Sequence, residues 1–218
     1  MAEENKDLLP LDRWIVSKFQ HLIAEVNAAY KEYEYHRIYH AVHDFCANDL
    51  SAIYLDLQKD NLYCNPADSQ ARRSCQHALR LMLVGMVKLL APILTYTCED
   101  IYKYIKNCIP AEKLEFVILA DLPQPDPALI NESVEKKYEK ILDLKDEIYK
   151  VLEKLRADKV IAASVEAKVV LTDTKEKLAE LDAKELEAIL IVSKVVLQAG
   201  PQQKIEVTKA DGEKCVRC

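Results

Sequence analysis

The sequence predicts a mainly α-helical protein, an antiparallel helical bundle followed by a small α+β domain. Over most of the first 107 positions, apolar residues recur at intervals of three and four, the period of a helix with one buried face. Glycine occurs only three times in 218 residues, and this scarcity favours helices. From about residue 165, apolar and polar residues alternate instead, which predicts strands.

The bundle is expected over residues 10–107, after a polar leader at 1–9 that we expect to be disordered. Pro10 suits the first position of a helix, and Asp12 is favourable in the first turn because its carboxylate faces the positive end of the helix dipole. Trp14 lies on the apolar face, so we interpret it as a core residue. The other members of this face are Leu11, Ile15, Phe19, Leu22, Ile23, Val26, Tyr30 and Tyr33.

A second helix is expected from about residue 36 to 63, and the bundle is organised around its stretch 44–63. A wheel of about 100° per residue places Asp49 inside the apolar arc and Tyr54 at its border. An unpaired buried carboxylate is costly, so we predict that Asp49 is structural and pairs with Arg72 or Arg73 of the next helix. The arc itself contains Ile38, Val42, Phe45, Cys46, Leu50, Ile53 and Leu57.

The third helix is expected to begin near Ala71, with Ser69 as its N-cap, and to end at Pro92, which lacks a backbone donor. Residues 97–100 are similar to a capping box that would begin a short helix through Lys106.

Residues 108–130 are expected to be a linker with a short extended segment at 116–119, because the proline-rich stretch 121–127 is incompatible with a helix. The second domain is expected over 131–214. It should contain a long amphipathic helix at 131–158, then strands near 165–171, 191–197 and 204–208, with one or two short helices over 175–190.

Composition and motifs exclude several classes of function. The net charge is −6, and residues 11–107 carry 11 basic and 11 acidic side chains, so any RNA contact must use a local basic patch. The sequence has no glycine-rich phosphate loop and no catalytic nucleophile motif, so we expect no catalytic residues in this chain. No stretch is long enough to span a membrane, and the chain opens on no signal peptide.

Cysteine and histidine usage indicates a reducing, cytoplasmic setting rather than a disulfide framework, because the seven cysteines have no framework spacing. Cys215 and Cys218 have the spacing of half a zinc site, whose other two ligands would have to come from beyond residue 218. We therefore expect 215–218 to be the truncated start of a zinc-binding tail, and the chain to be a piece of a longer protein. The five histidines we interpret as surface or stacking residues rather than metal ligands.

Basic and aromatic side chains are the remaining candidates for binding. Single-stranded RNA is bound by stacking its bases on aromatic rings and by pairing its phosphates with Lys and Arg. The alternative is that these residues are ordinary solvated charges and core tyrosines, because the segment is electrically neutral. The set comprises Arg13, Lys18, Arg37, Lys59, Arg72 and Arg73, with Tyr33, Tyr35, Tyr39 and Tyr54 between them.

Several segments resemble isoleucyl-tRNA synthetases of the bacterial type, in the same order along the chain. In the bundle these are Leu-Asp-Arg-Trp-Ile at 11–15, Asn-Asp-Leu-Ser-Ala-Ile-Tyr-Leu-Asp at 48–56, Ala-Arg-Arg-Ser at 71–74 and Leu-Ala-Pro-Ile-Leu at 90–94. These alone would fit several class I synthetases. Ser-Val-Glu-Ala-Lys-Val at 164–169 and Gly-Glu-Lys-Cys-Val-Arg-Cys at 212–218 narrow the resemblance to the isoleucine enzyme.

The resemblance implies the part of an isoleucine–tRNA ligase that binds the tRNA anticodon stem-loop, with residues 10–107 as the anticodon-binding bundle. It implies ATP- and Mg-dependent aminoacylation carried out by domains absent from this chain. It implies an isoleucine-specific tRNA and the remaining domains of the polypeptide as partners, no membrane, and a monomer that holds zinc at full length. Expected to hold tRNA phosphates are Arg13, Arg37, Lys59, Arg72 and Arg73, and Tyr54 is expected to approach loop bases. The alternative is a helical protein–protein interaction module without RNA binding, which would expose an apolar patch and no basic cluster.

Overall fold

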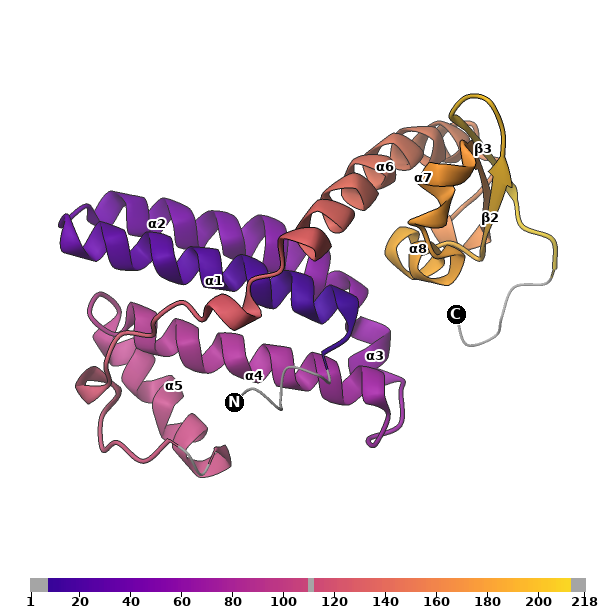
Figure 1. Ribbon diagram of the computed structural model, residues 1–218. Helices are drawn as coiled ribbons and strands as arrows, with labels where there is room; N and C mark the ends of the chain where they lie inside the picture. The colour runs from indigo at the N-terminus through magenta and orange to yellow at the C-terminus, as the bar shows by residue number, and fades with distance from the viewer. Residues whose placement is uncertain (1–7, 110–111, 213–218) are drawn as a thin grey trace. The chain divides into compact units, whose positions relative to one another are not determined.

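The computed structural model describes residues 8–109 and 112–212, in which helices predominate and a small mixed sheet lies near the C-terminal end (Figure 1). The predicted fold class is therefore confirmed. The chain divides into two compact units, Met1–Glu135 and Lys136–Cys218, and each is described by itself.

The first unit is a bundle of helices. Helix α1 packs against α2, and α4 packs against both α1 and α5 (Figure 1). Trp14 is buried on α1, as predicted, with Ile15, Phe19 and Val26. The helices are α1 (Pro10–Lys31), α2 (Tyr35–Asp44), a π-helical stretch (Phe45–Leu55), α3 (Lys59–Tyr63), α4 (Gln70–Leu90) and α5 (Thr95–Cys108).

Leu8 and Leu9 belong to the bundle, so the prediction of a disordered leader is wrong for these two residues. The Leu8 side chain is buried, and the Leu9 amide donates a hydrogen bond of 2.8 Å to the Ser74 hydroxyl on α4. Burying a leucine and satisfying a backbone donor outweigh the entropy of ordering two residues. Residues 1–7 lie outside the described part of the chain.

The expected single helix over 36–63 is instead an α-helix, a π-helical stretch and a short α-helix, with no long loop between them. A π-helix closes i→i+5 hydrogen bonds and holds more residues per turn than an α-helix. The apolar stripe therefore drifts from the 100° wheel, and within Phe45–Leu55 the buried residues are Phe45 and Tyr54. Leu50 and Ile53, which the wheel places in the core, are only partly buried.

The boundaries of α4 agree with the prediction, whereas the start of α5 does not. The Ser69 hydroxyl accepts the Arg72 amide as the N-cap of α4, and the helix ends at Leu90, before Pro92. Helix α5 begins at Thr95, whose hydroxyl donates to the Ala91 carbonyl, so the predicted capping box at 97–100 is wrong. The hydrophobic contact of Cys98 and Tyr102 with Val87 on α4 favours this earlier start.

Gly85 on α4 is required by the close approach of Phe19 from α1. A Cβ atom at this position would lie 2.7 Å from Phe19 Cε1, and Phe19 is itself buried and packs against Phe45 with ring centroids 5.7 Å apart. The ring therefore has little freedom to move away.

We expect Gly85→Ala to destabilise the bundle even though alanine is the better helix former. The gain in helix propensity is about 1 kcal/mol, and overpacking costs about 1–3 kcal/mol, so the free energy of unfolding should fall in urea denaturation. Adding Phe19→Leu should restore part of the loss by making room for the methyl group. A Gly85→Ala protein more stable than wild type would contradict this packing.

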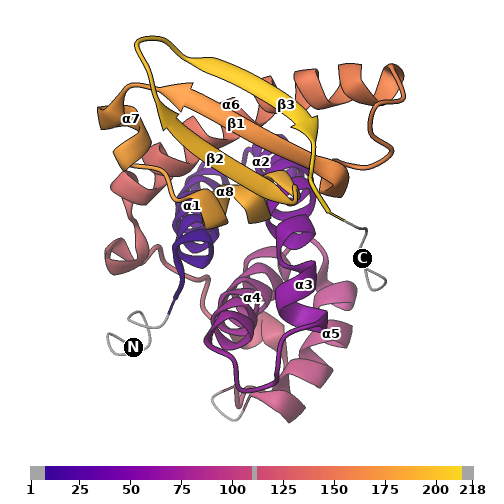
Figure 2. The ribbon, with the colours of Figure 1, turned by 90° about the vertical axis from the view of Figure 1, so that its right-hand side faces the viewer.

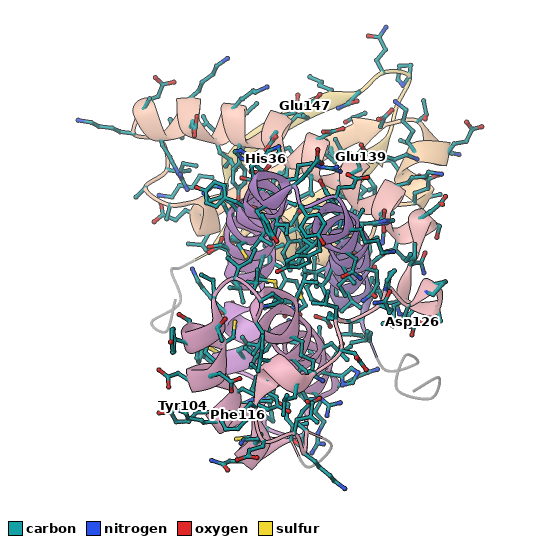
Figure 3. The ribbon with its side chains drawn as sticks, turned by 90° about the vertical axis from the view of Figure 1, so that its left-hand side faces the viewer. His36, Tyr104, Phe116, Asp126, Glu139 and Glu147 are labelled. Carbon is teal, nitrogen blue, oxygen red and sulfur yellow. The ribbon has the colours of Figure 1, made fainter. Side chains whose placement is uncertain are left out.

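The segment after α5 is attached to α1 by three buried polar side chains. The Asn27 amide donates to the Pro123 carbonyl at 2.8 Å, Gln20 Oε1 accepts the Asp126 amide at 2.9 Å, and the Ser17 hydroxyl accepts the Asn131 amide at 2.8 Å. The linker predicted at 108–130 is therefore fixed along α1 over its second half, and Figure 3 labels Asp126 on this segment.

The expected extended run at 116–119 is wrong, because Val117–Leu119 forms a 3₁₀ turn. Phe116 and Ala120 on either side have extended backbones, so the chain turns only where Val117 enters the core beside Tyr102 and Ile105. The burial of Val117 explains why residues 116–119, whose composition is typical of a strand, form a 3₁₀ turn instead.

The second unit combines a long helix with a three-stranded sheet of order β2-β1-β3 (Figure 2). Strand β1 (Ala167–Asp173) pairs in parallel with β2 (Lys194–Ala199) and antiparallel with β3 (Lys204–Lys209). Alternate residues of β1 are buried, as predicted. The helices are α6 (Glu132–Ala157), α7 (Lys175–Ala179) and α8 (Ala183–Leu190).

Candidate nucleic-acid interface at one end of the bundle

A buried carboxylate joins three helical segments at one end of the bundle. Asp12 is fully buried, and one of its oxygens accepts hydrogen bonds from the Tyr54 hydroxyl at 2.6 Å and from the Gln58 amide at 2.9 Å. Its other oxygen accepts the Ser74 hydroxyl. We call these four side chains the Asp12 centre. It connects the N-terminal parts of α1 and α4 to the π-helical stretch and to Gln58, which follows that stretch.

Burial sets the electrostatics of the Asp12 centre. It raises the pKa of Asp12 above the ordinary 3.8, although the hydrogen bonds from Ser74 and Tyr54 act in the opposite direction. Burial and the neighbouring Asp12 carboxylate raise the pKa of Tyr54, so its hydroxyl stays protonated and donates. Burial likewise raises the pKa of the adjacent Cys75 thiol to about 11, which keeps this cysteine in its unreactive form at neutral pH.

The raised pKa of Asp12 predicts a pH dependence of stability that Asp12→Asn removes. Above pH 3.8 the unfolded chain releases this proton, while the folded chain keeps it until the pH passes the raised pKa. The folded state binds more protons in that interval, so stabilisation present at low pH is lost as the pH rises. Urea titrations between about pH 3.5 and pH 7 should show the free energy of unfolding, relative to Asp12→Asn, falling with pH. Parallel profiles for the two proteins would contradict this linkage.

Three of the predicted phosphate-binding residues are sequence neighbours of the Asp12 centre, and Arg72 precedes one of them. Arg13 follows Asp12 in the sequence, Lys59 follows Gln58, and Arg73 precedes Ser74. The hydrogen bonds of the centre therefore fix the backbone position of each of these cationic residues. Lys59 and Arg73 are exposed, and Arg13 is partly buried. We call Arg13, Lys59, Arg72 and Arg73 the basic end of the bundle.

Arg72 differs from the others because it is part of the local structure. Its Nη1 donates to the Asn65 carbonyl at 3.0 Å and so holds the turn between α3 and α4. In the part of the chain that the structure describes, the Nε atoms of Arg13 and Arg72 are buried and have no hydrogen-bond partner.

Two of the predicted site residues take other roles. Tyr54 is 0% exposed, so the expectation that it approaches loop bases is wrong, and the reason is its bond to the Asp12 carboxylate. Arg37 lies at the opposite end of α1, where it pairs with Glu32 at 2.9 Å and Glu34 at 2.7 Å.

Asp49 does not pair with Arg72 or Arg73, so the predicted partner is wrong. Its carboxylate lies 3.9 Å from the Lys18 amine on α1, and its side chain is 25% exposed. The extra residues per turn of the π-helix rotate Asp49 to the edge of the buried stripe. Burial raises the pKa of Asp49, and Lys18 acts against this shift.

The sequence reading missed the Asp12 centre because its members are far apart in the chain and follow no known motif. One signal was available. Asp12 is an acid within a helix whose neighbouring positions are almost all apolar, and such an acid requires buried donors.

Neither a metal site nor a membrane span follows from the described residues. Between residues 8 and 212, less the gap at 110–111, no three His, Cys, Asp or Glu side chains gather as metal ligands. Cys215 and Cys218, predicted as half of a zinc site, lie outside the described residues. None of the helices within the described ranges is both long and apolar enough to cross a membrane.

The described residues thus form a helical bundle followed in the sequence by a small mixed sheet. The model of the family described as "Anticodon-binding domain of tRNA ligase" matches residues 12–171, and the chain belongs to this family.

Curated relatives extend over nearly the whole chain. This chain is 38% identical to the isoleucine–tRNA ligase of Symbiobacterium thermophilum. The match includes 99% of this chain and 25% of that protein. The chain is 39% identical to the isoleucine–tRNA ligase of Thermoanaerobacter sp. (strain X514) and 38% identical to that of Syntrophotalea carbinolica, covering 24% of each. The chain thus spans about a quarter of the length of the curated relatives it matches.

Proposed function

We propose that this chain is the anticodon-binding region of an isoleucine–tRNA ligase, in which it holds the anticodon arm of the isoleucine tRNA. The observation that carries the proposal is the family match over residues 12–171. Aminoacylation with ATP and Mg would take place on other parts of a longer, monomeric, cytoplasmic protein. Within that protein, residues 10–107 would form the anticodon-binding bundle and 131–214 a separate small domain.

The basic end of the bundle is the place we propose for phosphate contacts. Helices α1 and α4 both begin there, so the positive ends of two helix dipoles add to the charges of Lys59 and Arg73. Phosphate contacts orient an RNA without reading its sequence, which suits residues fixed to a buried structural centre.

A titration with isoleucine tRNA and an unrelated tRNA, at several salt concentrations, tests this function. We expect the affinity to fall with salt, with a slope set by the number of phosphate contacts, and to be higher for the isoleucine tRNA. The absence of both the salt slope and the preference would contradict the proposal.

A second surface, around α5, exposes apolar side chains that could bind other parts of the same protein. Around α5, Tyr96 is 91% exposed and Tyr104 74% exposed, and Phe116, Ile118 and Leu119 are exposed nearby in sequence (Figure 3 labels Tyr104 and Phe116). Apolar surface of this kind marks an interface. We propose that it packs against the remaining domains, and amide exchange of α5 should be slower in the full-length protein than in this chain. Equal exchange would contradict such docking.

The zinc prediction remains part of the same proposal. Cys215 and Cys218 would supply two thiolates, and two further ligands would complete a tetrahedral site in the longer protein.

A further inference from the structure

The outer face of α2 consists almost entirely of aromatic and imidazole rings. Six residues of this helix are exposed, and five of them carry a ring: Tyr35, His36, Tyr39, His40 and His43. The opposite face is held against the bundle by Ile38, which is buried. Figure 3 shows α2 from the end at which it begins and labels His36.

These rings are ordered against one another before any ligand binds. The Tyr39 ring lies 5.3 Å from that of His40, edge to face, and 5.7 Å from that of His43. The Tyr35 ring lies edge to face with Tyr30, whose hydroxyl is fixed by a 2.9 Å hydrogen bond to the Leu89 carbonyl. Pre-ordered rings lose little freedom on binding, which favours affinity.

The turn before α2 exposes a further ring at a cost to the backbone. Tyr33 has a φ of 57°, a left-handed conformation that glycine adopts freely and a bulky residue does not, and its side chain is 78% exposed. Tyr39 is 65% exposed. Exposed tyrosines with no aliphatic side chain among them are unlike the apolar patches by which proteins associate.

Polar and charged groups of both signs surround the rings. His36, His40 and His43 offer imidazole N–H donors, and Arg37 lies among them beside Glu32 and Glu34. The exposed acid on the helix itself is Asp44, which lies 3.6 Å from His43 Nδ1.

We propose that the outer face of α2, with Tyr33, Tyr35 and Tyr39, is a stacking platform for unpaired bases of an RNA. Ring faces bind single-stranded nucleic acid because every base has a π-face to stack, whereas a duplex keeps its base faces covered. The proposal rests on the proposed function. It adds that the basic end holds duplex phosphates while α2 holds the loop. Arg13 lies near the start of α1 and Tyr33 just beyond its end, about twenty residues away, which is about 30 Å along a helix and close to one turn of a duplex.

The test uses the 218-residue chain and a short single-stranded RNA with 2-aminopurine at its centre, whose fluorescence is quenched on stacking. Wild type should quench it, and Tyr35→Leu/Tyr39→Leu, which keeps the apolar volume and removes the rings, should bind at least ten-fold more weakly. The control Tyr96→Leu/Tyr104→Leu removes two exposed tyrosines of α5, which are 91% and 74% exposed, and should bind as wild type does. Tyr39→Trp, which retains a ring, should also keep the quenching.

Quenching that is absent in wild type, or equal in wild type and Tyr35→Leu/Tyr39→Leu, would overturn the platform. The tRNA titration separates this result from a failure of the proposed function. A preference for isoleucine tRNA without fluorescence quenching would contradict the stacking platform and leave the proposed function intact. Quenching by α2 without any tRNA preference supports the platform while the proposed function fails.

Discussion

Asp12→Ala is expected to lower the free energy of unfolding by about 3–5 kcal/mol, the largest stability effect that we predict. Three donors lose their acceptor together: the hydroxyls of Tyr54 and Ser74 and the side-chain amide of Gln58. These donors are at most 3% exposed, so water does not readily take the place of the carboxylate, and each unsatisfied donor costs about 1–3 kcal/mol. Urea denaturation followed by circular dichroism measures the change.

Two further variants separate the Asp12 centre from a general effect of removing an acid. Tyr54→Phe removes one donor and keeps the ring, so it should cost about 1–2 kcal/mol. Asp44→Ala removes an exposed acid from α2 and should leave the urea midpoint unchanged. Asp12→Ala with a midpoint close to that of Asp44→Ala would show that the centre does not hold the helices together.

The fold follows from the sequence wherever one local rule decides the structure. Pro10 begins α1, Ser69 caps α4, and Pro92 lies just beyond its end, because caps and prolines act within a few residues. Alternation of apolar residues likewise predicts β1, since one buried face fixes the side-chain register.

The candidate site was harder to predict because it depends on distant contacts and on an unexpected helical period. The predicted environments of Asp49 and Tyr54 were both wrong for the same reason. The wheel assumed an α-helix where the chain forms a π-helix, and the rotation moved the acid outward and the tyrosine inward. The buried acid of the bundle is Asp12, and its donors come from positions 42 to 62 residues away in the sequence.

The linker illustrates a second limit of sequence reasoning. Prolines at 121–127 correctly exclude a helix, but they do not reveal that Gln20 and Asn27 bind the backbone of this segment. Buried amides on an apolar helix face were the available signal, because each requires a partner.

The largest effect on binding is expected when the two exposed cations of the basic end are replaced together. For Lys59→Gln/Arg73→Gln, the slope of log affinity for tRNA against log salt should fall by about 1 for each lost phosphate contact. At 0.1 M salt the affinity should then fall roughly 25- to 60-fold, from the counterions no longer released. Fluorescence anisotropy with labelled isoleucine tRNA measures both quantities, and thermal melts should be unchanged because both side chains are exposed.

The chain offers a closely matched control for this variant in Lys103→Gln/Arg80→Gln. Lys59 and Lys103 each pair with an aspartate three residues earlier at 2.6 Å, and their side chains are 67% and 68% exposed. Arg80 is exposed on α4, two helical turns beyond Arg73. Both double variants remove the same charge, so equal losses of affinity would indicate attraction by net charge alone and would contradict a defined basic end. A loss confined to Lys59→Gln/Arg73→Gln would place the phosphates of the tRNA beside the Asp12 centre, where a buried carboxylate fixes the cations that bind them.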